Sequence, residues 1–211
     1  MERFKNRYAA GKILADLLKD YANRKDVIVL ALPRGGVPVA YEIANMLSLS
    51  LDVFIVRKLG VPGHEELAMG ALAIDDMTVF NKEILQDLCI SKQAIDDVID
   101  MEKQELHRRE VAYRGNKPFP VIKNKTIILV DDGIATGASI QVAIKALRQL
   151  EPAAIILAIP VAEASICNKL TKLVEKFICP MQPNNFFAVG QWYEEFNQTT
   201  DEEVCELLKK A

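Results

Sequence analysis

The chain has 211 residues, 50% of them hydrophobic, which is enough to bury one substantial core. Its formal net charge of -3 and its pI of about 5.6 give no sign of the basic surface typical of nucleic-acid-binding proteins. No apolar run is long enough to cross a bilayer, and residues 1–7 lead into an amphipathic helix and not into a signal peptide. We therefore expect a cytoplasmic protein, folded as a single domain over residues 1–211, that binds neither nucleic acid nor membranes.

Helices and strands are predicted to alternate in the first half of the chain, which begins with an amphipathic helix. The apolar stripe of this helix consists of Ile13, Leu14, Leu17, Leu18 and Tyr21. The predicted ranges are 3–21 (helix), 27–32 (buried strand), 37–47 (helix), 53–56 (strand), 57–66 (loop), 68–74 (strand) and 77–80 (strand). The last two strands flank a turn predicted at Asp75 and Asp76.

The second half continues this alternation after a long charged helix. Its predicted ranges are 91–113 (helix), 127–130 (strand), 139–150 (helix), 154–161 (strand), 162–173 (helix) and 176–179 (strand). A capping box formed by Thr200 and Glu203 opens a final helix that runs to Lys210. Strands that alternate with helices form βαβ units. We therefore expect an α/β fold with a mostly parallel central sheet and helices on both faces.

The run from residue 127 to residue 139 is the most informative part of the sequence. Four apolar β-formers end at two adjacent carboxylates, Asp131 and Asp132, and small residues then lead into a helix. A turn of this kind offers backbone N–H groups and the positive end of a helix dipole to a phosphate. Thr136 and Ser139 add hydroxyl donors, while the two carboxylates suit a pair of vicinal hydroxyls. The run therefore predicts a binding site for a phosphorylated sugar.

This run resembles the signature with which type I phosphoribosyltransferases bind 5-phosphoribosyl 1-pyrophosphate (PRPP). The resemblance covers every position from 127 to 139, with one departure at Gly133, where the family usually has an aliphatic residue. It implies transfer of ribose 5-phosphate from PRPP to a nitrogen nucleophile, with release of pyrophosphate. It also implies a homodimer, and a core with a small hood formed by residues 1–25 and 181–211. The pattern at residues 201–204 is similar to a stand-alone subfamily with no assigned acceptor.

The resemblance gives each part of the run a role. Asp131 and Asp132 would hold the ribose hydroxyls and favour the positive charge that develops on the sugar ring. The 5-phosphate would be anchored by Ala135, Thr136, Gly137, Ala138 and Ser139. Magnesium would be bound mainly through PRPP and pyrophosphate, because the sequence shows no cage of protein oxygen ligands.

A second anion-binding turn follows the first buried strand. Arg34 adds a guanidinium to two exposed N–H groups at Gly35 and Gly36, and a helix begins directly behind them. In the resembled family this turn binds pyrophosphate, and it often contains a non-proline cis peptide. We expect such a peptide next to Arg34.

The predicted loop at residues 57–66 takes the place of the family's flexible loop, which closes over the substrate and excludes water. We expect Arg57 and Lys58 to meet the leaving pyrophosphate as catalytic residues. His64 and Glu65 are candidate acid or base groups. The alternative for all of these residues is a solvated mobile loop, and a loop histidine without a visible partner is usually just exposed.

Two features concern the acceptor, which the sequence does not identify. In the 6-oxopurine enzymes of the resembled family an Asp precedes the Thr-Gly pair, whereas this chain has Ala135 there. A 6-oxopurine acceptor is therefore not expected, while adenine, orotate, uracil and amidophosphoribosyl variants stay open. Trp192 and Tyr193 either stack on a planar base or anchor the C-terminal segment to the core.

Two other functions stay open beside transfer. A regulator would use the same fold to sense PRPP without catalysis, although the chain shows no basic face for DNA. A hydrolase of a ribosyl phosphate would need a positioned general base, for which His64 or a glutamate of the predicted loop is available. Arg108, Arg109 and Arg114 alternate with glutamates, so we expect them on a solvated helix face.

Overall fold

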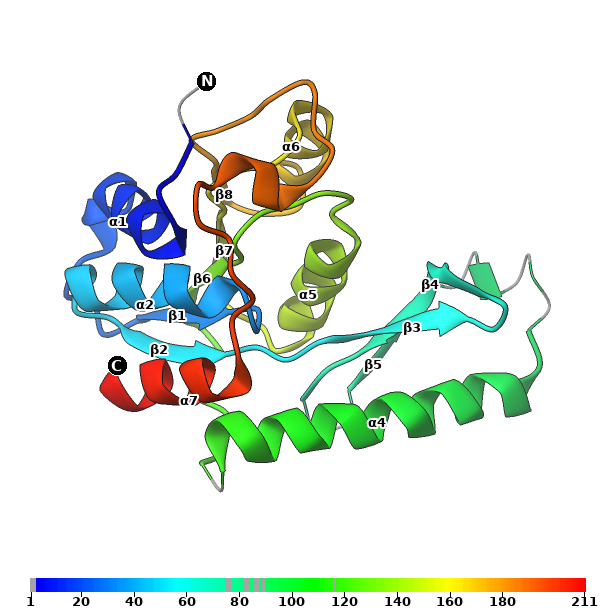
Figure 1. The fold of residues 1–211 in the computed structure, drawn as a ribbon. Coiled ribbons are helices and arrows are strands. Elements are labelled where there is room, and N and C mark those ends of the chain that lie inside the picture. The colour runs from blue at the N-terminus through cyan, green and yellow to red at the C-terminus, as the bar shows by residue number, and fades with distance from the viewer. Residues whose placement is uncertain (1–2, 75–76, 82–83, 86–87, 89, 116) are drawn as a thin grey trace.

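Figure 1 shows a computed structural model of the chain, which describes residues 3–74, 77–81, 84, 85, 88, 90–115 and 117–211. Its centre is a parallel sheet with the strand order β2-β1-β6-β7-β8. These strands are β1 (Val27–Ala31), β2 (Ser50–Val53), β6 (Thr126–Val130), β7 (Ala154–Ala158) and β8 (Lys176–Ile178). The predicted parallel sheet is confirmed, and the carboxyl ends of its strands meet at one edge.

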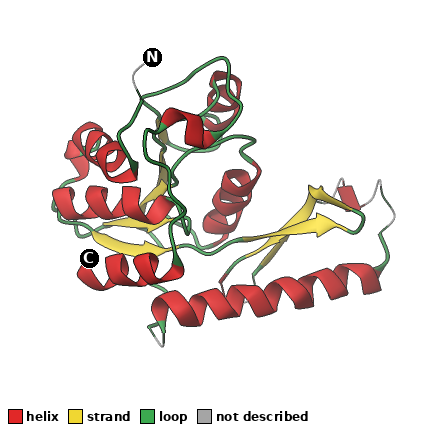
Figure 2. Ribbon diagram, in the orientation of Figure 1, coloured by secondary structure: helices red, strands yellow, loops and turns green. Residues whose placement is uncertain are grey.

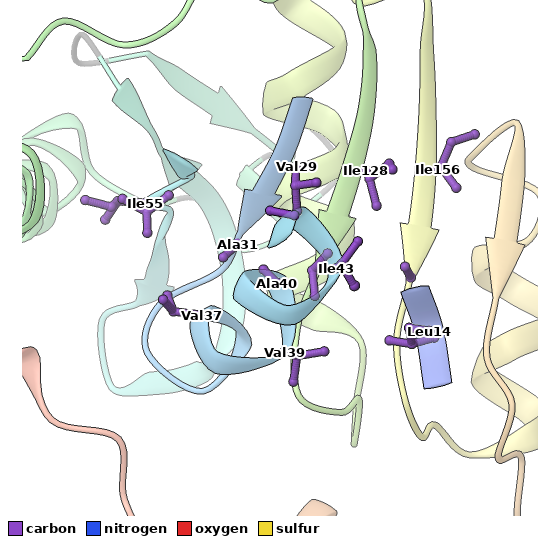
Figure 3. Close-up of a cluster of buried hydrophobic side chains, with 14 of the residues drawn as sticks. Leu14, Val29, Ala31, Val37, Val39, Ala40, Ile43, Ile55, Ile128 and Ile156 are labelled. Atoms are coloured by element: carbon purple, nitrogen blue, oxygen red, sulfur yellow. The ribbon is translucent and has the colours of Figure 1, made fainter. Parts of the chain in front are cut away.

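Helices cover both faces of this sheet, as the sequence predicts (Figures 1 and 2). One face is covered by α1 (Arg7–Leu17), α2 (Gly36–Leu47) and α7 (Asp201–Lys210), and the other by α5 (Ala138–Gln149) and α6 (Ala164–Leu170). Successive residues of a strand point to opposite faces. Val29, Ile128 and Ile156 accordingly pack in the cluster around α1 and α2 (Figure 3), while the residues directly before them pack against α5 and α6.

A second, antiparallel sheet extends away from the core, with a long helix beside it (Figure 1). It consists of β3 (Arg57–Val61), β4 (His64–Leu72) and β5 (Thr78–Phe80), and the helix is α4 (Lys92–Arg114). We call these four elements the arm. The C-terminal part of α4 returns to the core and contacts α7. The turn predicted at Asp75 and Asp76 lies outside the described residues.

The loop predicted at residues 57–66 is wrong, because most of it forms the β3–β4 hairpin of the arm. Gly60, Pro62 and Gly63, which are typical of a loop, belong to this hairpin. Gly60 sits at a register shift between the two strands, where a Cβ would lie 2.8 Å from the Glu65 carbonyl oxygen. Pro62 and Gly63 form the turn, and Gly63 has the positive φ of 79° that such a turn favours.

Several element boundaries also differ from the prediction, as a strand and a helix in the first half of the chain show. The strand expected at 53–56 lies at 50–53, where Ser50 and Asp52 pair with β1. Polar residues are tolerated there because β2 is an edge strand and is only half covered. The helix expected at 3–21 begins after Asn6, whose side chain accepts a hydrogen bond from the Ala9 N–H, and it ends at Leu17 before the short 3-10 helix η1 (Lys19–Tyr21).

The N-terminal segment around Phe4 lies beside residues 192–194 of the C-terminal segment. The Phe4 N–H donates to the Trp192 carbonyl at 3.0 Å, and the Glu194 N–H donates to the Phe4 carbonyl at 2.9 Å. These contacts join the two segments predicted to form the hood, whereas α7 lies away from them and packs beneath α2 (Figure 1). The Glu203 N–H donates to Thr200 Oγ1 at 3.2 Å, which confirms the predicted start of α7. No helix in the described part of the chain is long and apolar enough to span a membrane.

Candidate active site

A cleft of about 350 Å³ opens at the carboxyl ends of β1, β2 and β6. Four of the predicted site residues line it: Arg57, Lys58, Asp131 and Ser139. Pro33 lines it as well, beside the predicted pyrophosphate turn. In open parallel sheets, ligands bind outside the carboxyl ends of the strands. The cleft therefore lies where a parallel sheet places its ligands, and it brings these four residues together.

The turn between β6 and α5 has the geometry of an anion cradle. Gly137 is the N-cap of α5 and has a φ of 76°, which glycine adopts readily. The N–H groups of a helix's first turn have no partners within the helix. Ala135, Thr136 and Ser139 are exposed, and Ala138 is half-buried at the start of the helix. The five residues predicted to anchor a phosphate are thus brought together by one turn.

The two carboxylates of the run point in different directions. Asp131 lines the cleft, and its Oδ1 accepts the Asp132 N–H at 2.8 Å. The side chain of Asp132 is only 14% exposed, and its Oδ2 accepts from Arg7 Nε at 2.8 Å. Burial raises the pKa of both carboxyls, and the neighbouring Asp132 raises the pKa of Asp131 further. The Arg7 guanidinium opposes both shifts.

The predicted pyrophosphate turn lies directly against these carboxylates. A Cβ on Gly35 would lie 2.0 Å from Asp132 Oδ2, and a Cβ on Gly36 would lie 2.8 Å from the Val130 carbonyl oxygen. Only glycine fits at either position without displacing the acidic pair. The Pro33–Arg34 peptide is cis, which confirms the expectation at this place.

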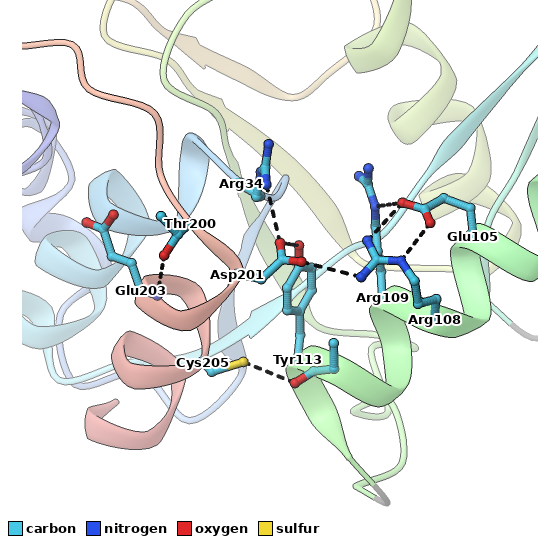
Figure 4. Close-up of polar contacts among 10 residues, drawn as sticks. Arg34, Glu105, Arg108, Arg109, Tyr113, Thr200, Asp201, Glu203 and Cys205 are labelled. Atoms are coloured by element: carbon cyan, nitrogen blue, oxygen red, sulfur yellow. Dashed lines mark hydrogen bonds and ion pairs between the residues drawn. The ribbon is translucent and has the colours of Figure 1, made fainter.

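The Arg34 side chain itself points toward the C-terminal helix (Figure 4). Its Nη1 lies 3.5 Å from Asp201 Oδ1, and the Tyr113 hydroxyl donates to the same oxygen at 2.6 Å. Arg108 reaches the other oxygen of Asp201 at 3.4 Å. The hydrogen bond from Tyr113 lowers the pKa of Asp201, as do the nearby arginines. The N-terminus of α7 thus holds the predicted pyrophosphate arginine in place.

Helix α4 adds two charged residues to the cleft, and one of them, Arg109, was expected on a solvated face. Arg109 and Glu102 both line the cleft. Glu102 Oε2 accepts from Arg57 Nε at 2.6 Å, and Glu105 Oε1 accepts from Arg109 Nε at 2.7 Å. Positions 102, 105 and 109 share one face of a helix. This spacing was the available signal, but only the fold of the arm shows what the face meets.

Trp192 and Tyr193 are 8% and 3% exposed, and neither ring presents a free face here. Trp192 stacks on Phe186 with ring centroids 6.2 Å apart. Tyr193 packs between Phe4 and Phe196, and its hydroxyl donates to the Asp132 carbonyl at 2.5 Å. Of the two alternatives for this pair, these contacts support anchoring. Base stacking by either ring stays a prediction.

His64 and Glu65 lie at the start of β4, at the tip of the β3–β4 hairpin, and both are exposed. Neither residue is among those that line the cleft. Their position agrees with the solvated alternative, and no contact among the described residues supports an acid or base role.

Gly133, the departure from the resembled signature, lies under the hood. A Cβ at this position would come within 2.4 Å of Val189 Cγ1 and 3.2 Å of Val161 Cγ1. Val189 begins the short 3-10 helix η3 (Val189–Trp192). Its side chain therefore fills the space that an aliphatic residue at 133 would need.

The model of the phosphoribosyl transferase domain family matches residues 5–191, so the chain belongs to this family. Two Mycobacterium tuberculosis proteins, from strains CDC 1551 and H37Rv, are 39% identical over all 211 residues, and both are provisionally named phosphoribosyl transferases. The chain spans only about half of their length, 47%.

A protein of Enterococcus faecalis named bifunctional protein pyrR is 32% identical over 131 residues, which cover 60% of this chain and 66% of that protein. The crystal structure of a protein from Thermus thermophilus matches with a TM-score of 0.89 and 35% identity. That match covers 99% of this chain and 98% of the other.

The contact between Gly133 and Val189 gives a test of the hood's position. Gly133→Ala should destabilise the protein by about 1–3 kcal/mol, as overpacking of a filled space does. Val189→Ala in the same chain should recover most of this loss, because it removes the methyl groups that the new Cβ meets. Urea unfolding of both single variants and of the double variant measures this. Purely additive losses would contradict the contact.

Proposed function

We propose that this protein transfers ribose 5-phosphate from PRPP to a nitrogen nucleophile and releases pyrophosphate. One observation supports this most directly: the end of the predicted phosphate-binding turn and an acidic residue line the same cleft as a group of cations. From the turn at residues 135–139 it is Ser139 that lines the cleft, the acid is Asp131, and the cations are Arg57, Lys58 and Arg109. A sugar that carries both a phosphate and a pyrophosphate needs groups of both kinds.

In the proposed reaction the C1–O bond to pyrophosphate breaks, and its electron pair leaves with the pyrophosphate. The lone pair of the acceptor nitrogen forms the new bond to C1, and the proton that this nitrogen loses passes to the released pyrophosphate or to water. The turn at 135–139 anchors the 5-phosphate and fixes the sugar for attack. Asp131 and Asp132 hold the ribose hydroxyls and stabilise the positive charge on the ring. The negative charge of the leaving pyrophosphate is stabilised by the cations Arg34, Arg57, Lys58 and Arg109.

Magnesium fits this scheme as a companion of PRPP. Among the described residues, no three His, Cys, Asp or Glu side chains are grouped so that they could hold a metal ion. The ion would therefore take most of its oxygen ligands from pyrophosphate, ribose and water. When bound, it neutralises part of the pyrophosphate charge. A homodimer and a cytoplasmic location stay expectations.

The test is a screen of acceptors with Mg-PRPP that reads pyrophosphate release. Wild-type protein should bind Mg-PRPP in titration calorimetry and release pyrophosphate with at least one nucleobase or amine. The variant with Asp131→Asn and Asp132→Asn should bind PRPP more weakly by several kcal/mol, because a charge-assisted hydrogen bond contributes about 1.5–3 kcal/mol. Unchanged affinity in that variant would contradict the assignment. PRPP binding without release for any acceptor would favour the sensing alternative.

A second prediction concerns the acceptor. We expect no salvage of hypoxanthine or guanine, because Ala135 lacks the carboxylate that 6-oxopurine enzymes of the resembled family place beside the purine. Loss of such a group typically costs about 10²–10⁴-fold in rate. A spectrophotometric assay with Mg-PRPP and each purine base measures this. Turnover of either base near an ordinary enzymatic rate, on the order of 10 per second, would show that the inference from Ala135 is wrong.

Arg108 and Arg109 offer a matched pair for testing the pyrophosphate subsite. Both bond to Glu105, but only Arg109 lines the cleft, and their side chains are 53% and 24% exposed. Arg109→Gln should weaken binding of Mg-pyrophosphate by about tenfold or more, as expected for a lost charge-assisted bond. Arg108→Gln should change it by less than about fivefold, as expected for an exposed ion pair. Equal effects in calorimetry would remove Arg109 from the subsite.

A further inference from the structure

Arg7, in the first turn of α1, is a buried arginine that reaches the acidic pair from the hood. Only 8% of the surface of Arg7 is exposed. Nε donates to Asp132 Oδ2 at 2.8 Å, and Nη1 donates to the Asn197 carbonyl at 2.7 Å. The guanidinium carbon lies 3.8 Å from the centre of the Phe196 ring. One side chain thus joins the N-terminal helix, the C-terminal segment and the predicted PRPP-binding run.

The Asp132 carboxylate is restricted from two sides. Arg7 is stacked on Phe196 and bonded to backbone, so its guanidinium has little freedom to move. On the other side the Gly35 backbone approaches so closely that a Cβ there would lie 2.0 Å from Asp132 Oδ2. The direction of the carboxylate is therefore set by Arg7 on one side and by the pyrophosphate turn on the other.

The ion pair between Arg7 and Asp132 also affects the protonation of the two adjacent carboxylates. Two adjacent, mostly buried carboxylates repel each other and resist ionisation. Arg7 lowers the pKa of both, against the effect of burial. Tyr193 of the C-terminal segment faces Asp132 as well, and the hydrogen bond to its carbonyl does not supply a positive charge. Across the cleft, Asp131 shares its cavity with Arg57, Lys58, Glu102 and Arg109.

We propose that Arg7 is a positioning residue for PRPP: it orients Asp132 and supplies the positive charge that keeps the acidic pair ready to accept the ribose hydroxyls. The proposal rests on the proposed function, because the ligand is the ribose of PRPP. On this proposal the hood contributes to the sugar site through Arg7, which contacts the carboxylate of Asp132 and not the sugar itself.

Tyr8 provides a matched control on the same helix. Its hydroxyl donates to Glu203 Oε1 at 2.8 Å, so it also joins α1 to the C-terminal segment. This hydroxyl bonds to Glu203 and not to the acidic pair. Tyr8→Phe removes one such link and leaves the charge around Asp132 unchanged. A role of Arg7 that is merely structural would be reproduced by this variant.

The first experiment measures the affinity for Mg-PRPP by calorimetry between pH 5.5 and pH 8.5. Arg7→Gln should weaken binding at pH 7 about tenfold or more, the equivalent of losing one charge-assisted interaction. The pH below which binding is lost should also move upward, because the acidic pair protonates more easily without Arg7. Arg7→Lys should restore part of both effects, and Tyr8→Phe should match wild type in its pH profile.

The second experiment needs no PRPP and still reports on the pair. Urea unfolding of Arg7→Gln, Asp132→Asn and the double variant forms a cycle in which Arg7→Gln should lose less stability when Asp132 is already replaced. Carboxyls whose pKa is raised by folding take up protons as the pH falls, and this stabilises the folded state. The deficit of Arg7→Gln should therefore be larger at pH 7.5 than at pH 5.5, whereas that of Tyr8→Phe should be the same at both.

The outcomes separate the two proposals. Wild-type protein that does not bind Mg-PRPP would overturn the proposed function, and with it the role of Arg7 toward ribose. Wild-type binding together with an unmoved pH profile in Arg7→Gln, or with equal changes in Tyr8→Phe, would overturn the positioning role alone. If Arg7→Gln does not fold, a pH profile of Arg7→Lys that falls below that of Tyr8→Phe at pH 5.5–7 supports the role, and identical profiles overturn it.

Discussion

The predicted site depends on glycine at positions 35 and 36, where there is no room for a side chain. β1 and β6 are neighbouring parallel strands in which Ala31 pairs with Val130, so the turns that follow them meet at one edge of the sheet. At that meeting a Cβ on Gly35 would overlap the Asp132 carboxylate, and one on Gly36 would press on the backbone of β6. Glycine at both positions lets a turn of N–H groups lie beside two carboxylates. The groups predicted to bind pyrophosphate and those predicted to bind ribose are thus adjacent at this edge of the sheet.

The sequence predicted the features that are encoded locally. The end of β6 and the turn to α5 follow from a few adjacent residues, as does the cap at Thr200. The features it missed depend on distant partners. Gly60, Pro62 and Gly63 are typical of a loop, and only pairing with β4 makes them a bulge and a turn. Arg7 meets Asp132 across 125 positions, and no helical pattern carries that information.

Arg57 and Arg109, which line the cleft, and Arg34, which follows β1, each contact a carboxylate in this structure. Arg57 bonds to Glu102, Arg109 bonds to Glu105, and Arg34 faces Asp201. A carboxylate presents two oxygens in the geometry that a phosphate also offers to a guanidinium. The carboxylates therefore hold the arginines in place before any anion arrives. Under the proposed function, binding of pyrophosphate would exchange one set of oxygen partners for another, which lowers the ordering cost of the flexible side chains.

Gly133 and Arg7 together show how the hood is fixed to the run at residues 127–139. An aliphatic side chain is missing at 133, yet Val189 of the hood places its methyl groups in the same space. The hydrophobic contact at this end of the sheet is thus supplied by the hood and not by the turn. Tyr193 bonds the Asp132 carbonyl and Arg7 bonds the Asp132 carboxylate, so three contacts from both chain ends converge on two adjacent residues. One contact is to the Asp132 carbonyl, one is to its carboxylate, and one lies at Gly133. The hood therefore cannot shift without moving Asp132.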